Sequence, residues 1–290
     1  MYYRTPLASI LLNLTGQIRR ANSGINCTRI LGFNSPCEFG FPIFLWVAAQ
    51  FGVLKDFNNQ VSKWRDLSLN SRDFVQDTAL QQPIYEVNGI NGLPSIRTSS
   101  AQGMRMSSIC AAPCSVFYVA RMTGGSSYSI LYDGFGYWYL GWANGNMNFF
   151  RDGEGATLTG VGITKLADTN PYLYTAIQNG IDSSVYCNGA LIAYSSVYKR
   201  GPDSYGLYFG GSNAMISEIV VYKAGLSREQ RLQVEAYFQI KYALWKTSCP
   251  LNSNGSSILS GCICTLSFNG SLPIYTAIRN ASVWSFFNKQ

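Results

Sequence analysis

Short apolar runs separated by polar turn dipeptides fill the chain from residue 44 to residue 222. The runs are rich in β-branched and aromatic residues, which favour strands. Asn-Gly and Asp-Gly pairs, which accept the positive φ angles of hairpin turns, begin at residues 88, 91, 133, 144, 152, 179 and 188. We therefore expect hairpin-linked strands at 115–121, 128–132, 137–142, 147–151, 172–177, 184–187, 190–194, 206–209 and 216–222.

The last of these strands leads directly into a helical pattern, and residues 216–244 contain both. Ser227 and Gln230 form the S-x-x-Q pattern of a capping box, which predicts that a helix begins just after Ser227. Because this helix follows a series of strands, we expect it to close a β domain by packing one apolar face on it. The residues at helical spacing on that face are Val234, Tyr237 and Phe238.

Several blocks of sequence occur in the order found in a known fold family. They are Leu-Trp-Val-Ala-Ala at 45–49, Val-Ser-Lys-Trp-Arg-Asp at 61–66, Gln-Pro-Ile-Tyr at 82–85, Asn-Gly-Ile-Asn-Gly-Leu-Pro-Ser-Ile-Arg at 88–97, a Tyr-x-Asn-Gly hairpin within 184–194, and the strand and helix at 216–244. With these blocks, residues 44–245 resemble the concanavalin A-like, laminin-G-like jelly roll. The resemblance implies an all-β fold, a two-sheet antiparallel sandwich with one closing C-terminal helix and irregular, disulfide-bearing extensions. An acidic residue often follows the early Leu-Trp block in that family, whereas Val47-Ala48-Ala49 follows here, so no metal or polar role is carried over to that position.

We expect three regions along the chain. Residues 1–43 form an extended arm or partial module, 44–246 the jelly roll, and 247–290 a cysteine-containing, glycosylated extension. In the last region, Cys249-Pro-Leu-Asn-Ser and Cys262-Ile-Cys264 resemble the first part of an ephrin-receptor-like cysteine module, although no cysteine follows Cys264. The apolar run at 39–49 is far shorter than the roughly 20 residues of a membrane span, so none is expected.

Charge and histidine content narrow the classes of function. The net charge is +7, but the basic residues are scattered, so the dense patch expected of a nucleic-acid-binding protein is missing from the sequence. The chain contains no histidine, which removes the usual general base and the usual metal ligand. A Ser-His or Cys-His nucleophile is therefore excluded.

Cysteines and glycosylation sequons favour an extracellular or cell-surface location. Eight cysteines without histidine partners and without a C-x-x-C pair indicate disulfides rather than zinc. Sequons begin at Asn13, Asn26, Asn254, Asn269 and Asn280, all outside residues 45–245. Candidate bridges are Cys27–Cys37, Cys110–Cys114 and Cys249–Cys262. Cys187 and Cys264 remain, and either they form a fourth bridge or Cys264 forms a bridge to another chain. Eight cysteines allow 105 connectivities, so the pairing stays open.

Catalysis receives little support from the acidic residues. Hydrolysis of a glycosidic bond needs two carboxyl groups at a set separation. The close acidic pair is Asp152 and Glu154, in a Gly-containing turn where a solvated loop is expected. Glu229 and Glu235 belong to the predicted helix and are expected to face solvent. We therefore expect a protein that is not an enzyme.

The aromatic ladder at 137–142 raises a binding alternative. Tyr137, Trp138, Tyr139 and Trp142 could stack sugar rings, but side chains alternate across a strand, so one set is expected in the core. No cofactor is expected. Calcium bound through Asp133, Asp152 or loop carbonyls is a weaker alternative, because isolated acidic residues in turns make poor sites.

The features together favour a non-catalytic extracellular glycoprotein with a structural or adhesive role. Its jelly roll would be a building block, and its terminal extensions would contact other copies in a homo-oligomer or polymer. Strand addition gives a physical route, since an apolar tail such as residues 272–278 can complete a sheet edge. The alternative is a lectin-like carbohydrate-binding protein, and a glycoside hydrolase ranks third.

Overall fold

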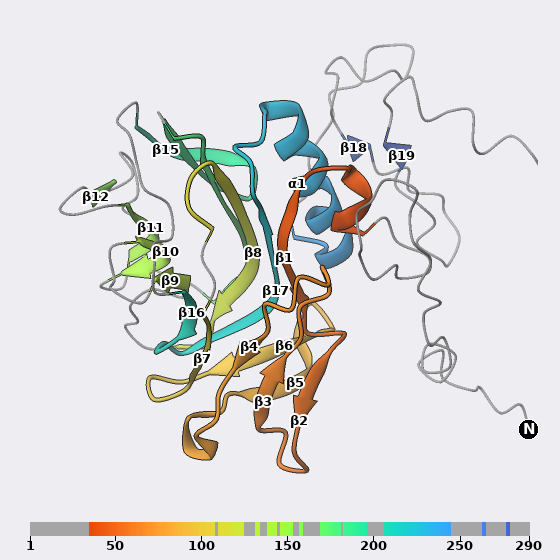
Figure 1. Cartoon of the computed structure of the whole chain (residues 1–290), viewed down its shortest axis with the longest axis vertical. Helices are drawn as coiled ribbons and strands as arrows, with labels where there is room; N and C mark the ends of the chain where they lie inside the picture. Colours follow the sequence, from red (N-terminus) through yellow and green to blue (C-terminus); the bar gives the residue numbers. More distant parts are fainter. Residues whose placement is uncertain are drawn as a thin grey trace, which may run out of the picture.

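The computed structural model describes residues 35–107, 110–124, 131–133, 138–143, 146–152, 157–158, 169–180, 182–195, 206–244, 263–264 and 277–278. Within these ranges the chain consists mainly of antiparallel strands, with one α-helix and two short 3-10 helices (Figure 1). The predicted strand positions are confirmed to within a few residues.

An eight-stranded sheet forms the middle layer of the molecule. Its strands are β1 (Ile43–Ala48), β5 (Ile84–Ile90), β6 (Leu93–Thr98), β8 (Cys114–Met122), β13 (Tyr172–Gln178), β14 (Ser183–Cys187), β15 (Ala190–Ser195) and β17 (Ala214–Tyr222). They run in the order β15-β14-β13-β8-β17-β6-β5, and β1 also pairs with β17. β17 is therefore the central strand: β8 lies along one edge, while β6 and β1 share the other.

A nine-stranded sheet packs against this middle layer. Its strands are β2 (Val53–Lys55), β3 (Val61–Trp64), β4 (Phe74–Val75), β7 (Gly103–Met106), β9 (Leu131–Asp133), β10 (Trp138–Ala143), β11 (Asn146–Asp152), β12 (Thr157–Leu158) and β16 (Leu207–Gly210). The order is β12-β11-β10-β9-β16-β7-β4-β3-β2. The predicted two-sheet antiparallel sandwich is thus confirmed.

The main hydrophobic core lies between the two sheets. The alternation of side chains along each strand sends every second residue into this core. On β1, for example, Leu45 and Val47 enter it, whereas Trp46 and Ala48 point to the other face of the eight-stranded sheet. The nine-stranded sheet contributes an aromatic group in which the ring of Phe209 lies 5.5 Å from that of Trp64 and 5.2 Å from that of Phe74.

A third layer covers the outer face of the eight-stranded sheet. It contains α1 (Arg228–Tyr242) and the 3-10 helix η3 (Pro36–Phe39), and Figure 1 shows α1 beside β17 and β1, on the side away from β9 to β12. Val234 and Phe238 of α1 are fully buried in a second hydrophobic core. η3 is held to this layer by Tyr222, whose hydroxyl donates to the carbonyl of Pro36 at 2.9 Å.

The predicted start of the helix is confirmed in atomic detail. The N–H of Gln230 donates to Ser227 Oγ at 3.3 Å, and the N–H of Ser227 donates to Gln230 Oε1 at 2.9 Å. The prediction that Glu235 faces solvent is wrong. Glu235 is buried and pairs with Arg231 at 2.5 Å, because the guanidinium of Arg231 packs 3.7 Å above the ring of Tyr186 on β14 and this side of the helix is covered. Burial raises the pKa of Glu235, an effect that Arg231 partly offsets.

The Asn-Gly pairs divide into two groups. Asn91-Gly92 and Asn188-Gly189 have positive φ at both residues and turn the chain between β5 and β6 and between β14 and β15, as predicted. Asn88-Gly89 is not a turn, because it continues β5. Its glycine faces Ser95 so closely that an added Cβ would lie 1.5 Å from Ser95 Oγ.

Beyond residue 244 the structure describes two short strands, β18 (Ile263–Cys264) and β19 (Ala277–Ile278), which pair with each other. The end of the 272–278 segment thus pairs with a strand of its own extension. The described residues contain no helix long and apolar enough to cross a membrane. A further 3-10 helix, η4 (Ala79–Gln81), follows β4.

Candidate functional site

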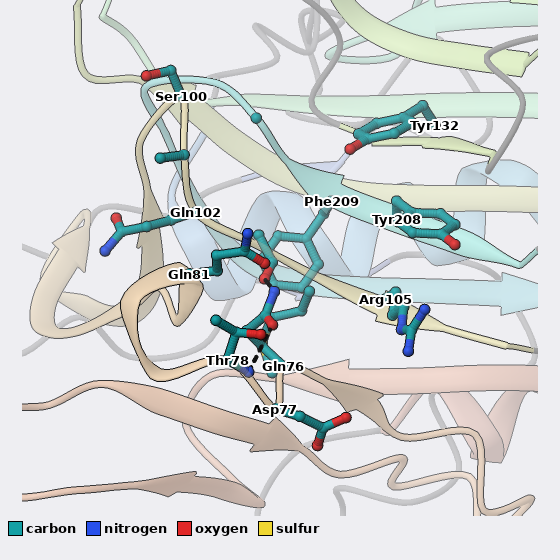
Figure 2. Close-up of a pocket in the computed structure, with 14 residues that line it drawn as sticks. Gln76, Asp77, Thr78, Gln81, Ser100, Gln102, Arg105, Tyr132, Tyr208 and Phe209 are labelled. Atoms are coloured by element: carbon teal, nitrogen blue, oxygen red, sulfur yellow. Dashed lines mark hydrogen bonds between the residues drawn. The ribbon is translucent and has the colours of Figure 1, made fainter.

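A pocket of about 480 Å³ lies on the outer face of the nine-stranded sheet, where β4, β7, β16 and β9 run side by side (Figure 2). This volume is within the range of about 300–1,000 Å³ that small-molecule sites occupy. The described residues that line it are Gln76, Asp77, Thr78, Gln81, Ser100, Ala101, Gln102, Gly103, Met104, Arg105, Tyr132, Tyr208, Phe209 and Gly211.

Strand alternation brings the functional side chains of the pocket to this face. On β7, Met104 and Met106 enter the core, so Arg105 between them points outward and is exposed. Leu131 beside Tyr132 on β9 and both neighbours of Tyr208 on β16 are likewise buried, and both tyrosines are partly exposed. The alternation that fills the core with apolar side chains therefore also places Arg105, Tyr132 and Tyr208 on the outer face of the sheet.

Strand register joins these three side chains into one row. Tyr208 is paired with Arg105 on one side and with Tyr132 on the other. The rings of Tyr132 and Tyr208 are stacked, with centroids 5.6 Å apart and planes 20° from parallel. One wall of the pocket is therefore an aromatic surface that ends in a guanidinium group, as Figure 2 shows.

The opposite wall consists of loop residues fastened by glutamine side chains. Gln76 accepts from the N–H of Thr78 at 3.1 Å and donates from Nε2 to the carbonyl of Gly103 at 2.9 Å. Gln102 donates from Nε2 to the carbonyl of Gln82, also at 2.9 Å. These amides hold the loops together, and the exposed polar side chains of this wall are Asp77, Thr78, Gln81 and Ser100.

Gly210 allows the two walls to approach. Its φ is +118°, and an added Cβ would lie 2.4 Å from the carbonyl oxygen of Gln102 and from Cα of Gly103. The next residue, Gly211, donates its N–H to the carbonyl of Gln102 at 2.9 Å. A side chain at position 210 would push the 99–102 loop away from β16 and change the shape of the pocket.

This arrangement suits a ligand with a flat apolar face and a polar edge. Tyrosine rings offer an apolar surface for stacking, while the amide, hydroxyl and carboxylate groups opposite them can bind hydroxyls. Asp77 is the one carboxylate among the described lining residues. A hydrolytic mechanism with two carboxyl groups would need a second.

None of the predicted aromatic ladder is among the described residues that line the pocket. Trp138 is fully buried and donates from Nε1 to Gln178 Oε1 at 3.2 Å, so its assignment to glycan stacking is wrong: its position on β10 faces the core. In the strand register, Tyr139 on β10 is the partner of Tyr132 on β9. Trp142 lies on β10 where the register shifts, and Tyr137 is outside the described residues.

Sequence reasoning missed the side chains that form the row. Tyr132 and Tyr208 each stand within a predicted strand, next to residues that enter the core, and this alternation was the available signal. Arg105 lies in a strand that was not predicted. That these three positions are neighbours depends on strand order, which the local pattern does not contain.

The cysteines are used differently from the prediction. Cys110, Cys114 and Cys187 are buried thiols, so the proposed Cys110–Cys114 bridge and any bridge to Cys187 are wrong. The two sulfurs of the proposed bridge face different partners, since Cys114 Sγ lies 3.3 Å from Gln178 Oε1 and Cys110 Sγ lies 3.8 Å from the carbonyl of Tyr222. Cys37 does form a disulfide, whereas its predicted partner Cys27 is outside the described residues.

The other predicted site residues lie apart from the pocket or outside the described residues. Asp133 and Asp152 end β9 and β11, which have β10 between them. In the described part of the chain, no group of three potential metal-ligating side chains is close enough to hold an ion. The residues outside the described ranges are Asn13, Asn26, Glu154, Cys249, Asn254, Cys262, Asn269 and Asn280.

Comparison with known proteins reveals similarity of fold. No family model and no curated protein sequence matches the chain. Among solved structures, the binding domain of Paraclostridial Mosquitocidal Protein 1 aligns at a TM-score of 0.52 and 15% identity, over 79% of this chain and 56% of that one. Domain 4 of AbnA, a GH43 extracellular arabinanase from Geobacillus stearothermophilus, solved with arabinotriose, aligns at a TM-score of 0.49 and 14% identity, over 66% of this chain and 96% of that one. The botulinum neurotoxin serotype D binding domain aligns at a TM-score of 0.46 to 0.47 and 16% identity, over 67% of this chain and about half of that one. This chain therefore spans little more than half of the mosquitocidal binding-domain chain, and what it shares with it is the β-sandwich fold.

Proposed function

We propose that this protein is a non-catalytic binding module and that the pocket on its nine-stranded sheet takes a carbohydrate. The observation that carries the proposal is the stacked pair Tyr132 and Tyr208, which is partly exposed directly opposite a polar loop wall. For this reason we prefer the lectin-like alternative to a purely structural role.

The chemistry of the pocket matches the two sides of a sugar. A pyranose ring has a face of C–H groups that can lie on an aromatic ring, and a rim of hydroxyls that both donate and accept. Asp77 accepts only, whereas Gln81 can donate and accept, so together they meet both needs. Because the strands hold Tyr208 between two paired neighbours, the ring is already placed before a ligand arrives, which lowers the entropic cost of binding.

An extracellular location is part of the proposal. The disulfide at Cys37 supports it, because such bonds persist in oxidising compartments. The likeness of the fold to the binding domain of Paraclostridial Mosquitocidal Protein 1 is consistent with a binding role for such a sandwich.

A glycan array compared across three variants tests the proposal. Tyr208→Ala should weaken binding about tenfold or more, which corresponds to about 1.4 kcal/mol and is a typical magnitude for a lost aromatic contact. Tyr208→Phe should retain most of the binding, since the ring stays. Phe57→Ala, a change at a 93% exposed aromatic residue outside the pocket, is the matched control and should have no effect. If the wild-type protein binds no glycan, or if Tyr208→Ala binds as well as the wild type, the proposal fails.

A subunit role in an assembly is the second candidate, and β15 is the observation that favours it. β15 ends the eight-stranded sheet with β14 as its one partner among the described strands, and its Leu191 and Tyr194 are 57% and 58% exposed. Exposed apolar edge strands are templates for pairing with another chain. Light scattering should find oligomers that are lost with Leu191→Lys or on deletion of residues 265–290. Leu80→Lys, at an 86% exposed leucine on η4, is the control, and a strictly monomeric wild-type protein would remove this candidate.

A further inference from the structure

Arg105 is exposed and is the one basic residue among the described residues that line the pocket. Lys63, on β3 of the same sheet, pairs with Asp73 at 3.4 Å. Among the described residues, Arg105 has no carboxylate within ion-pair distance. Its guanidinium lines the pocket beside Tyr208 (Figure 2), so a fixed strand presents a positive charge at the end of the aromatic surface.

A guanidinium in this position has a specific preference. It is planar and presents a fork of N–H donors that matches the two oxygens of a carboxylate or a sulfate, and it keeps its charge at all ordinary pH values. Other charges in the molecule have the same sign on balance, with a net charge of +7, which favours the approach of anions.

Asp77 on the opposite wall sets the orientation of such a ligand. Its carboxylate repels a second anionic group and accepts hydroxyls, so an anion fits at Arg105 and a neutral, hydroxyl-bearing edge fits at Asp77 and Gln81. Arg105 lies on β7 and Asp77 follows β4, the strand that pairs with β7, and Figure 2 shows the charged ends of the two side chains apart from each other. A ligand with one acidic end and one neutral end satisfies both walls.

We propose that the ligand of this pocket is an acidic saccharide, whose carboxylate or sulfate group pairs with Arg105 while its ring lies on Tyr208. This inference rests on the proposed carbohydrate-binding function and names the class of sugar. Arg105 acts here as a specificity-determining residue, because it separates acidic from neutral forms of the same oligosaccharide.

The test uses an array in which each neutral oligosaccharide is matched by its sulfated and its carboxylated derivative. The readout is the ratio of acidic to neutral binding within each variant of the full chain. The wild-type ratio should be at least tenfold at low salt and should fall as salt increases. Arg105→Gln should bring the ratio near one, and Arg105→Lys, which keeps the charge without the fork, should give an intermediate value. Lys63→Gln, which removes a paired cation outside the pocket, should keep the wild-type ratio.

The outcomes separate the two proposals. Preference for the sulfated or for the carboxylated derivatives would identify the anionic group. Equal binding of neutral and acidic probes that still depends on Tyr208 would overturn the acidic preference and leave the carbohydrate-binding function standing. An acidic preference that survives Arg105→Gln would also overturn it, and a wild-type protein that binds none of the probes would overturn both.

Discussion

Glu218 offers the sharpest test of how α1 is held on the sandwich. It lies in the middle of β17 and is fully buried, yet its carboxylate accepts four hydrogen bonds. Oε1 accepts from Trp46 Nε1 and from the hydroxyl of Tyr237, both at 2.7 Å. Oε2 accepts from Lys241 Nζ at 2.7 Å and from the hydroxyl of Tyr242 at 2.8 Å. This one side chain therefore joins β17 to β1 and to three residues of α1.

Glu218→Gln keeps the size of the side chain and removes its charge. The side chain of Lys241 is only 9% exposed, so its ammonium group would remain buried without a counter-ion and would face an amide donor. Removing one partner of a buried ion pair costs about 3–5 kcal/mol, and we expect a loss in this range from the free energy of unfolding. For a domain of this size, that loss corresponds to a fall of roughly 6–20 °C in Tm.

Urea unfolding followed by circular dichroism measures this loss, with the slope against denaturant unchanged if both states keep their compactness. Glu86→Gln is the matched control: its carboxylate pairs with Arg97 at 2.6 Å, but the two side chains are 35% and 39% exposed, so we expect about 0–1 kcal/mol. In the double variant Glu218→Gln with Lys241→Met, the two losses should overlap by about 2 kcal/mol. A loss below about 1 kcal/mol for Glu218→Gln, or strict additivity with Lys241→Met, would refute the reasoning.

Three further predictions follow from local geometry. Ser227→Ala should cost about 1 kcal/mol of stability in urea unfolding, because it removes the hydroxyl that caps α1, and Ser227→Asp should restore most of it. Gly210→Ala should lower Tm and also weaken glycan binding, because the added Cβ would lie 2.4 Å from the carbonyl oxygen of Gln102 and displace the loop that lines the pocket. Unchanged glycan binding would show that the pocket does not depend on this contact. Burial raises the pKa of Tyr118, Tyr222, Tyr237 and Tyr242 well above the usual value of 10.0, so their stabilising contribution is complete below pH 10 and is lost as the pH rises further, by up to about 5 kcal/mol per pH unit for four groups. Exposed tyrosines ionise without unfolding, so the test is the final part of the rise in tyrosinate absorbance, which should coincide with the loss of circular dichroism in alkali. Ionisation of all 19 tyrosines before unfolding would contradict this.

Local features of the chain were predictable because they depend on residues close in sequence. The hydrogen bonds of the capping box join Ser227 and Gln230, one turn apart, so their pattern in the sequence places the start of α1. Asn91-Gly92 and Asn188-Gly189 adopt positive φ because Asn and Gly tolerate it. The same dipeptide at 88–89 stays within β5, at the point where the register between β5 and β6 shifts and where Gly89 faces Ser95 too closely for a side chain.

Residues whose role depends on distant partners were predicted poorly. Glu235 has an exposed, polar helical position by its sequence, but Tyr186 and Arg231 cover it. Cys110 and Cys114 are close enough in sequence to suggest a bridge, whereas the structure directs their sulfurs to the carbonyl of Tyr222 and to Gln178. In each case one neighbour comes from a strand far away in the sequence, namely β14 for Tyr186, β17 for Tyr222 and β13 for Gln178, and spacing along the chain does not reveal it.

The sequence alone was sufficient for the fold class, the positions of most strands and the helix that closes the domain, because alternation, turn residues and caps act over a few residues. The candidate site required the tertiary structure. Arg105, Tyr132 and Tyr208 belong to three strands far apart in the chain, and they meet because β7, β16 and β9 are neighbours in one sheet and in a register that pairs these residues. Strand order and register are set by the packing of the whole sandwich, and so is the pocket.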